Sequence, residues 1–207
     1  MALVAFISQK GGVGKSSLSQ ALTTEAVRSG LRAKLADLDN LQGSSIDWSR
    51  IRIAQGVDPE VPVQQYGTLA AALREATDHD YFVIDGAARS TQNTMALAQE
   101  ADLLIQPTGP SLSDLRVGIR VFNELKGAGI LVDRLVFVLY KVGSIAEEAD
   151  ARNFIVSAGY RVLKGSVPEK VAFRTCLNNG KAITEVSIRS LRVKAEELVD
   201  SITKELK

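Results

Sequence analysis

The chain has 207 residues, of which 45% are hydrophobic and 24% charged, a composition typical of an ordinary globular protein. Its formal net charge of +1 excludes a global attraction to nucleic acid or to an anionic membrane, so any such binding needs a local patch. The single cysteine, Cys176, excludes an intrachain disulfide and a metal site built from cysteines alone. The length suits one α/β unit, and we expect residues 1–207 to form a single domain.

Apolar runs rich in β-branched residues alternate with amphipathic stretches along the whole chain. The apolar runs predict strands at residues 3–8, 32–37, 81–85, 103–107, 134–140 and 161–166. The amphipathic stretches predict helices at residues 15–29, 44–55, 68–78, 91–101, 111–127, 145–157, 169–177 and 185–206. This alternation favours an α/β fold, in which a mostly parallel, twisted sheet carries helices on both faces.

The segment 55–67 interrupts the alternation with Gly56, Pro59 and Pro62. Glycine and proline mark turns, so we expect a loop or an edge excursion there rather than a boundary between domains. No apolar run approaches the roughly 20 residues that span a bilayer. Because the first expected strand starts close to Met1, we also expect no signal peptide and a cytoplasmic location.

Residues 10–17, K-G-G-V-G-K-S-S, lie between the first expected strand and the first expected helix. A glycine-rich turn there lets backbone N–H groups converge on phosphate oxygens, and the helix N-terminus adds a partial positive charge. Lys15 is then placed to reach the β- and γ-phosphates, and the Ser16 hydroxyl to ligate Mg²⁺. The motif predicts a nucleoside triphosphate site formed by Gly11, Gly12, Val13, Gly14, Lys15, Ser16 and Ser17.

The loop departs from the common pattern G-x-x-x-x-G-K-[ST], because Gln9 replaces the first glycine and a second lysine, Lys10, begins the loop. In this form it resembles the deviant Walker A loop of the ParA/MinD family of P-loop ATPases. The resemblance implies a P-loop NTPase fold of the SIMIBI type, ATP and Mg²⁺ as cofactors, and a homodimer that forms on ATP binding. It also implies that Lys10 reaches the partner subunit's nucleotide, so that hydrolysis depends on dimerisation and the basal rate is slow.

Two aspartates, Asp37 and Asp39, follow the second expected strand. Carboxylates at this end of a parallel strand project into the crevice where open α/β sheets bind ligands, although the pair also suits a turn and helix cap. The stretch 37–44 resembles the family's switch I, D-x-D-P-Q-[GS], which implies that Asp39 orients the attacking water and contributes to the metal site. Residues 40–42, Asn-Leu-Gln, hold one residue more than the P-Q of that pattern.

The third expected strand is apolar and ends at Asp85. A carboxylate delivered beside a phosphate loop is the Walker B arrangement, in which Asp85 holds Mg²⁺ directly or through water. Residues 86–88, Gly-Ala-Ala, depart from the D-[TC]-P-P that relatives usually carry at this switch. The motifs and the resemblance together predict metal ligands and a catalytic set: Ser16, Asp39 and Asp85 for the metal, and Lys10, Lys15 and Asp39 for hydrolysis.

A later stretch, residues 167–182, resembles the family segment whose start lines the adenine pocket. The resemblance implies that Pro168 contacts the base and that the base is adenine. The asparagine that relatives often carry after the preceding strand is absent, and Tyr140 and Lys141 occupy that place.

Basic residues gather between positions 170 and 194. A solvated mixed-charge helix explains them without further function, because acidic residues follow directly. The resemblance instead implies non-specific DNA binding, which acts on phosphates and weakens steeply with salt. Under that interpretation the contacts come from Lys170, Arg174, Arg189 and Arg192.

The sequence as a whole is most similar to short ParA-type partition or positioning ATPases without an N-terminal DNA-binding domain. The resemblance implies an ATP-sandwich dimer that binds DNA and hydrolyses ATP when a ParB-like or other cargo-bound activator stimulates it. A MinD-like membrane-associated regulator fits less well, because residues 196–207 carry four acids and two lysines without an aromatic anchor. We therefore expect no stable membrane association.

A conjugation-linked relative that binds DNA stays open. A metabolic transferase built on the same loop would need a substrate pocket that the sequence does not reveal. An iron–sulfur ATPase needs more than one cysteine per chain.

Overall fold

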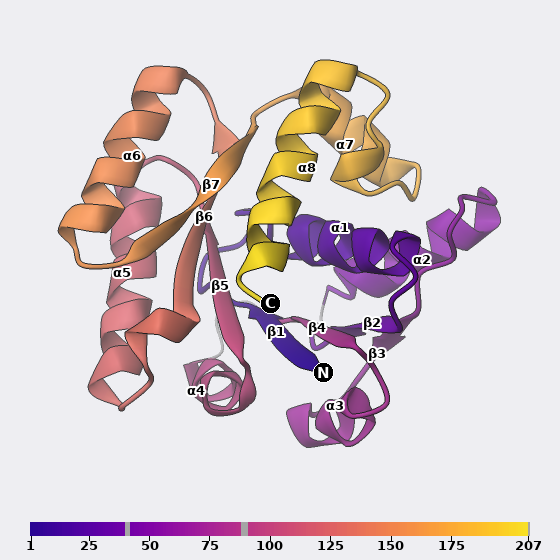
Figure 1. Cartoon of the computed structure of the whole chain (residues 1–207), viewed down its shortest axis with the longest axis horizontal. Helices are drawn as coiled ribbons and strands as arrows, with labels where there is room; N and C mark the ends of the chain where they lie inside the picture. Colours follow the sequence, from indigo (N-terminus) through magenta and orange to yellow (C-terminus); the bar gives the residue numbers. More distant parts are fainter. Residues whose placement is uncertain (40–41, 88–90, 207) are drawn as a thin grey trace.

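The computed structural model describes residues 1–39, 42–87 and 91–206, and Figure 1 shows its architecture. A seven-stranded sheet runs through the described part in the order β3-β2-β4-β1-β5-β6-β7, and each neighbouring pair of strands is parallel. Helices lie on both of its faces. The expected α/β fold with a parallel sheet is therefore confirmed.

The central strands are continuous apolar runs because helices cover them on both sides. Their bounds are close to the expected ones: β1 (Ala2–Phe6), β2 (Ala33–Asp37), β4 (Tyr81–Asp85), β5 (Leu103–Thr108), β6 (Leu135–Val142) and β7 (Arg161–Pro168).

One strand was not expected. β3 (Val63–Gln65) lies inside the segment 55–67, where we expected a loop or an edge excursion. It pairs with β2 at the edge of the sheet, with Val63 opposite Leu35. The sequence gives little sign of it because the strand has 3 residues, of which Gln64 and Gln65 are polar and exposed, so no apolar run forms.

The helices also follow the expected pattern. They are α1 (Lys15–Arg28), α2 (Ser44–Ala54), α3 (Leu69–Ala76), α4 (Thr91–Glu100), α5 (Leu112–Gly127), α6 (Ile145–Ser157), α7 (Val171–Asn178) and α8 (Arg189–Lys204), with 3₁₀ turns at Val132–Arg134 and Ile183–Glu185. No helix in the described residues has both the length and the hydrophobicity to cross a membrane.

Two expected helix starts were wrong. The helix expected from residue 169 starts at Val171, because the Glu169 N–H still donates to the carbonyl of Val142 and so extends the strand pairing. The helix expected from residue 185 starts at Arg189. Glu185 instead ends a 3₁₀ turn, where its carboxylate accepts the N–H of Ala182 at 2.6 Å.

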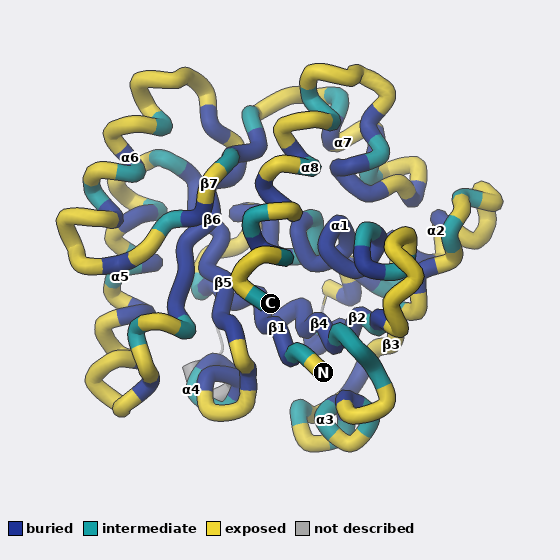
Figure 2. The backbone as a smooth tube through the Cα atoms, in the orientation of Figure 1, coloured by how far each residue is buried: buried dark blue, intermediate teal, exposed yellow. Residues whose placement is uncertain are grey.

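The helices form two layers, each with its own apolar core (Figure 1). α1, α2, α7 and α8 contribute to the core on one face of the sheet, whereas α3, α4, α5 and α6 contribute to the core on the other. Figure 2 shows the strands as the buried centre and the outer helix faces and loops as the exposed parts. Burial of apolar surface on both sides of the sheet is the main stabilising term of such a fold.

The strand order gathers the predicted functional residues at the C-terminal ends of the central strands. β1 lies between β4 and β5, so the chain leaves the middle of the sheet in both directions. In open parallel sheets, ligands bind at the C-terminal ends of the strands where the order reverses. The segments that follow β1, β2 and β4 contain the glycine-rich loop, Asp39 and Gly86, and the last residues of β2 and β4 are Asp37 and Asp85.

Candidate functional site

The glycine-rich loop connects β1 to α1, which starts at Lys15. Gly12 and Gly14 have φ angles of +75° and +102°, a region that glycine enters without steric cost. A Cβ atom on Gly14 would lie 2.6 Å from ring atoms of Tyr140, so any other residue would force this ring to move. Gly14 is also the N-cap of α1 and has no side chain to bind the first-turn N–H groups. These donors and the helix dipole suit an anion such as a phosphate.

Asp85 ends β4, and only 2% of its surface is exposed. The Ser45 hydroxyl donates to its Oδ2 atom at 2.8 Å. The Oδ1 atom is buried without a hydrogen-bond partner among the described residues. Burial raises the pKa of Asp85 to about 6, while the hydroxyls of Ser16 and Ser45 and the charge of Lys15 lower it. The structure therefore brings Lys15, Ser16 and Asp85 together.

This carboxylate has the features of a Mg²⁺ site. Mg²⁺ binds through one or two carboxylates together with phosphate oxygens and water, so a cluster of acidic residues is not required. The described residues contain no group of three or more His, Cys, Asp or Glu that could hold a metal by themselves. The buried, unpartnered Oδ1 of Asp85 and the nearby Ser16 hydroxyl are oxygen ligands of the required kind. The residues present fit the ion.

Asp37 is fully buried beside Asp85, its partner in the β2–β4 register. Its carboxylate accepts backbone N–H groups of Asp39 and Ser45 at 2.9 Å and of Ile46 at 3.2 Å. Burial raises the pKa of Asp37, and these three hydrogen bonds oppose that rise. Asp37 thus accepts first-turn N–H groups of α2, whose N-cap residue is Gly43, and this is a structural role for the first aspartate of the pair.

Asp39 follows β2 and is half-buried. Its Oδ1 atom accepts the N–H of Gln42 at 3.0 Å, and its carbonyl accepts the N–H of Gly43. The role of Asp39 in orienting water and binding metal stays a prediction. Of residues 40–42, which hold one residue more than the family pattern, Asn40 and Leu41 lie outside the described residues, as does Ala88 of the second switch.

Lys10 begins the loop with 43% of its side chain exposed. Its ammonium group forms an ion pair with Asp114 in the first turn of α5 and lies 3.2 Å from the Ser113 hydroxyl. A cavity of about 470 Å³ lies beside this pair, and Tyr140 and Glu147 contribute to its lining. The loop and α5 therefore share one open crevice.

A second cavity, of about 210 Å³, lies at the ends of β6 and β7. Tyr140, Pro168 and Phe173 give it aromatic and apolar walls, and it suits a planar base. Burial raises the pKa of Tyr140, and the nearby Ser17 hydroxyl lowers it. Pro168 lines this cavity, and its contact with the base stays a prediction. Tyr140 was not among the expected contacts, and its only sequence signal was the missing asparagine.

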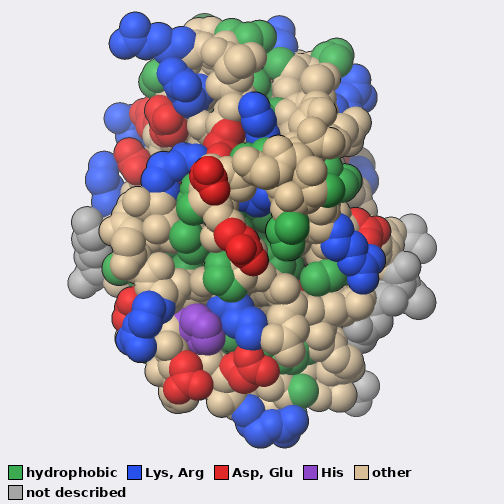
Figure 3. Space-filling view, turned by 90° about the vertical axis from the view of Figure 1, so that its right-hand side faces the viewer, with side chains coloured by type: hydrophobic (Ala, Val, Ile, Leu, Met, Phe, Trp, Pro, Cys, Tyr) green, Lys and Arg blue, Asp and Glu red, His purple; other side chains and the backbone are tan. Residues whose placement is uncertain are grey.

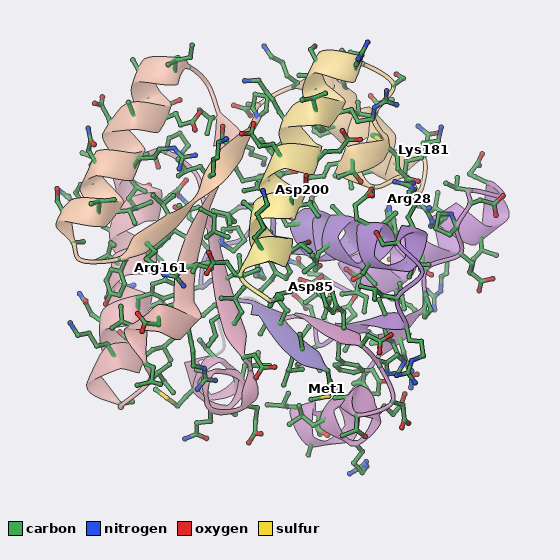
Figure 4. All side chains as sticks on the ribbon, viewed as in Figure 1. Met1, Arg28, Asp85, Arg161, Lys181 and Asp200 are labelled. Carbon is green, nitrogen blue, oxygen red and sulfur yellow. The ribbon has the colours of Figure 1, made fainter. Side chains whose placement is uncertain are left out.

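The four expected DNA contacts divide into two pairs. Arg189 and Arg192 lie at the start of α8 and line a pocket of about 720 Å³ with Arg28 and Lys181. Figure 4 shows Arg28 and Lys181 close together at the end of α1. Lys170 and Arg174 instead line the base cavity.

Acidic residues offset part of the positive charge of the pocket at the start of α8. Arg28 pairs with Glu185 at 2.7 Å, and Arg192 lies 3.9 Å from Glu196. On the face in Figure 3, acidic and basic side chains are interspersed. DNA binding by these residues stays a prediction.

Comparisons with known proteins agree on the family. The model of the CobQ/CobB/MinD/ParA nucleotide-binding domain matches residues 4–183. No curated protein sequence matches the chain.

Solved structures share the fold. The chain is similar to MinD from Pyrococcus horikoshii in complex with Mg-ADP, with 17% identity, 98% and 96% of the two chains covered and a TM-score of 0.73. It is similar to apo McdA from Cyanothece, with 17% identity, full coverage of both chains (100% and 100%) and a TM-score of 0.74. It is also similar to a protein assigned to plasmid partition in Borrelia burgdorferi B31, bound to AMPPNP, with 16% identity, 99% of each chain covered and a TM-score of 0.73. The chain therefore belongs to the CobQ/CobB/MinD/ParA family of nucleotide-binding P-loop domains.

Proposed function

We propose that the chain is a ParA-type partition or positioning ATPase, which binds ATP with Mg²⁺ and hydrolyses it to ADP and phosphate. One observation carries the proposal: Asp85 is buried close to the Ser16 hydroxyl at the start of α1, and its Oδ1 atom has no hydrogen-bond partner among the described residues. A carboxylate and a hydroxyl in this position suit a Mg²⁺–triphosphate unit on the adjoining loop. The family match and the AMPPNP complex of the Borrelia protein support ATP as the nucleotide.

Hydrolysis would need positioning and charge rather than covalent chemistry. Bound Mg²⁺ supplies positive charge to the phosphates. The loop N–H groups bind phosphate oxygens, Lys15 reaches the β- and γ-phosphates, and Asp39 orients the attacking water. The partner subunit's Lys10 completes the site in an ATP-bound homodimer. The exposure of Lys10 supports such a reach, because its side chain lines the open crevice.

The ATP-bound dimer would bind DNA without sequence preference. Arg189 and Arg192, with Arg28 and Lys181 next to them, are the best-grouped cations for this role. Lys170 and Arg174 lie by the base cavity, so bound nucleotide can influence them directly. A ParB-like or other cargo-bound activator would then stimulate hydrolysis and release the DNA. The protein would act in the cytoplasm, on the nucleoid when ATP is bound.

A MinD-like membrane role is the alternative. It would need an exposed apolar helix face, such as an amphipathic helix at the membrane surface. In α8 the apolar residues Ala195, Leu198, Val199 and Ile202 are buried against the core. This burial favours the DNA-binding alternative for the C-terminal third.

Co-sedimentation with DNA tests the proposal. The protein is mixed with random-sequence duplex DNA in Mg²⁺ with a non-hydrolysable ATP analogue, with ADP, or without nucleotide, at low and high salt. We expect binding only with the ATP analogue, lost at high salt. Binding to anionic liposomes instead of DNA would favour the membrane alternative. A protein that stays monomeric and binds neither would contradict the proposed function.

A further inference from the structure

Ser45 contacts the candidate magnesium carboxylate, although no motif points to it. It lies in the first turn of α2, fully buried, and its hydroxyl donates to Oδ2 of Asp85 at 2.8 Å. A charge-assisted hydrogen bond between two buried groups is stronger than one at the surface. The hydroxyl of Ser45 therefore holds the orientation of this carboxylate more strongly than a hydroxyl at the surface would.

The direction of this hydrogen bond is fixed by its neighbours. The Gln20 side chain, from α1, donates its Nε2 to the Ser45 oxygen at 3.3 Å. A hydroxyl has one proton to donate, and the Gln20 contact uses an acceptor position of the Ser45 oxygen, so the Ser45 proton remains directed at Oδ2 of Asp85. The Ser45 backbone N–H donates to Asp37 at 2.9 Å. Elements α1, α2, β2 and β4 thus all meet at Ser45.

This arrangement leaves the two oxygens of Asp85 unequal. Oδ2 is taken by Ser45, whereas Oδ1 has no partner among the described residues. The carboxylate cannot turn without breaking this buried hydrogen bond, so Oδ1 keeps its place and remains available to an ion. The same bond attaches the first turn of α2, just after the segment that follows Asp39, to the end of β4.

We propose that Ser45 is a positioning residue, which keeps Oδ1 of Asp85 turned toward the magnesium site and so couples α2 to Mg²⁺ binding. The inference rests on the proposed function, because it requires Mg²⁺–nucleotide at the loop. It predicts that loss of the hydroxyl weakens Mg²⁺ specifically and leaves the contacts of the loop with the nucleotide intact.

A magnesium titration tests it without turnover. Binding of a fluorescent ATP analogue is measured in EDTA and then as Mg²⁺ is added. Ser45→Ala should raise the Mg²⁺ midpoint about tenfold, the effect of losing one hydrogen bond to a charged group, and change affinity in EDTA less than about twofold. Ser44→Ala is the matched control, because Ser44 is the exposed neighbour in the same turn, and its midpoint should equal that of the wild type.

Gln20→Met provides a second test, which leaves Asp85 and Ser45 themselves unchanged and removes the Gln20 contact with the Ser45 oxygen. It frees the orientation of the Ser45 hydroxyl and should raise the midpoint about threefold. An unchanged midpoint in both variants overturns the inference, as does an equal loss of affinity in EDTA, which indicates general damage to the loop. A wild-type protein whose nucleotide binding ignores Mg²⁺ overturns the proposed function instead, so the two failures are distinguishable.

Discussion

The ammonium group of Lys10 forms an ion pair with Asp114 of the same chain, between the phosphate loop and the first turn of α5. The family resemblance implies a different contact for Lys10, namely the nucleotide of the partner subunit. One ammonium group cannot do both at once. The ion pair with Asp114 therefore competes with the contact that would complete the dimer.

Asp114→Asn should shift this competition toward the dimer. The pair is partly exposed, and such pairs contribute up to about 1 kcal/mol. We expect ATP-analogue-dependent dimerisation at a two- to about fivefold lower protein concentration, measured by sedimentation velocity. Glu205→Gln is the control, because it removes another partly exposed pair, with Arg161, and should leave dimerisation unchanged. An identical dimerisation midpoint for Asp114→Asn and wild type would show that the pair does not compete.

Lys10→Ala separates binding from turnover. The subunit that holds the nucleotide on its own loop keeps Lys15, Ser16 and the loop N–H groups. The affinity of the variant for a fluorescent ATP analogue should therefore stay within about threefold of the wild-type value. Steady-state ATP hydrolysis should fall by about 10³, the scale of an arginine finger supplied by a second subunit. Unchanged turnover in this variant would refute the assignment of Lys10 across the dimer.

Gly14→Ala should damage the loop for a local reason. Its new Cβ would meet the Tyr140 ring at 2.6 Å, and the φ angle of +102° is strained for alanine. We expect a loss of about 1–3 kcal/mol in the free energy of unfolding, measured with urea. Gly11→Ala is the control, since nothing lies within 4 Å of its would-be Cβ, and its loss should stay below about 0.5 kcal/mol. Equal losses would contradict the packing of Tyr140 on Gly14.

The features that were predictable from the sequence are those set by residues close together along the chain. The alternation of strands and helices gave the parallel fold, and the loop lies between β1 and α1 because its glycines and its flanking elements are contiguous. Asp85 was predictable as the end of an apolar strand.

Contacts between distant segments were not predictable in this way. Ser45 reaches Asp85 only after β2 and β4 pair, and Lys10 reaches Asp114 only after α5 packs beside β5. The edge strand β3 was not predicted because it forms through pairing with β2 and has no apolar pattern of its own.

The separation of the basic residues into two pairs yields a test of DNA binding. Arg189→Ala with Arg192→Ala removes two charges from the pocket at the start of α8, away from the base cavity. We expect weaker DNA binding, a fall of about two in the slope of log affinity against log salt, and unchanged nucleotide affinity. Lys170→Ala with Arg174→Ala should lower both DNA and nucleotide affinity. If DNA affinity is unaffected in both double variants, none of these four residues belongs to the DNA-binding surface.

Glu185 should give the fold a specific sensitivity to acid. It bonds to Arg52, whose side chain is 1% exposed, at 2.6 Å, and it also pairs with Arg28. Burial tends to raise the pKa of Glu185, but hydrogen bonds from Arg52 and the Ala182 N–H and the charges of Arg52 and Arg28 lower it below the ordinary 4.5. A lowered pKa means that the stabilisation is complete above the unfolded-state value and is lost as the pH falls through the folded-state value.

Glu185→Gln should therefore cost about 3 kcal/mol at pH 7, because Arg52 is left buried without its counter-charge. Its unfolding free energy should also fall less steeply than that of the wild type when the pH is lowered from about 5 into the acid range. Urea unfolding at several pH values measures both effects. Glu197→Gln, which breaks the more exposed pair with Lys164, should match the wild type within about 0.5 kcal/mol at each pH. Parallel pH curves for Glu185→Gln and wild type would mean that the buried pair does not contribute to acid unfolding, and that Arg52 is held by its bonds to the Pro59 and Gly180 carbonyls instead.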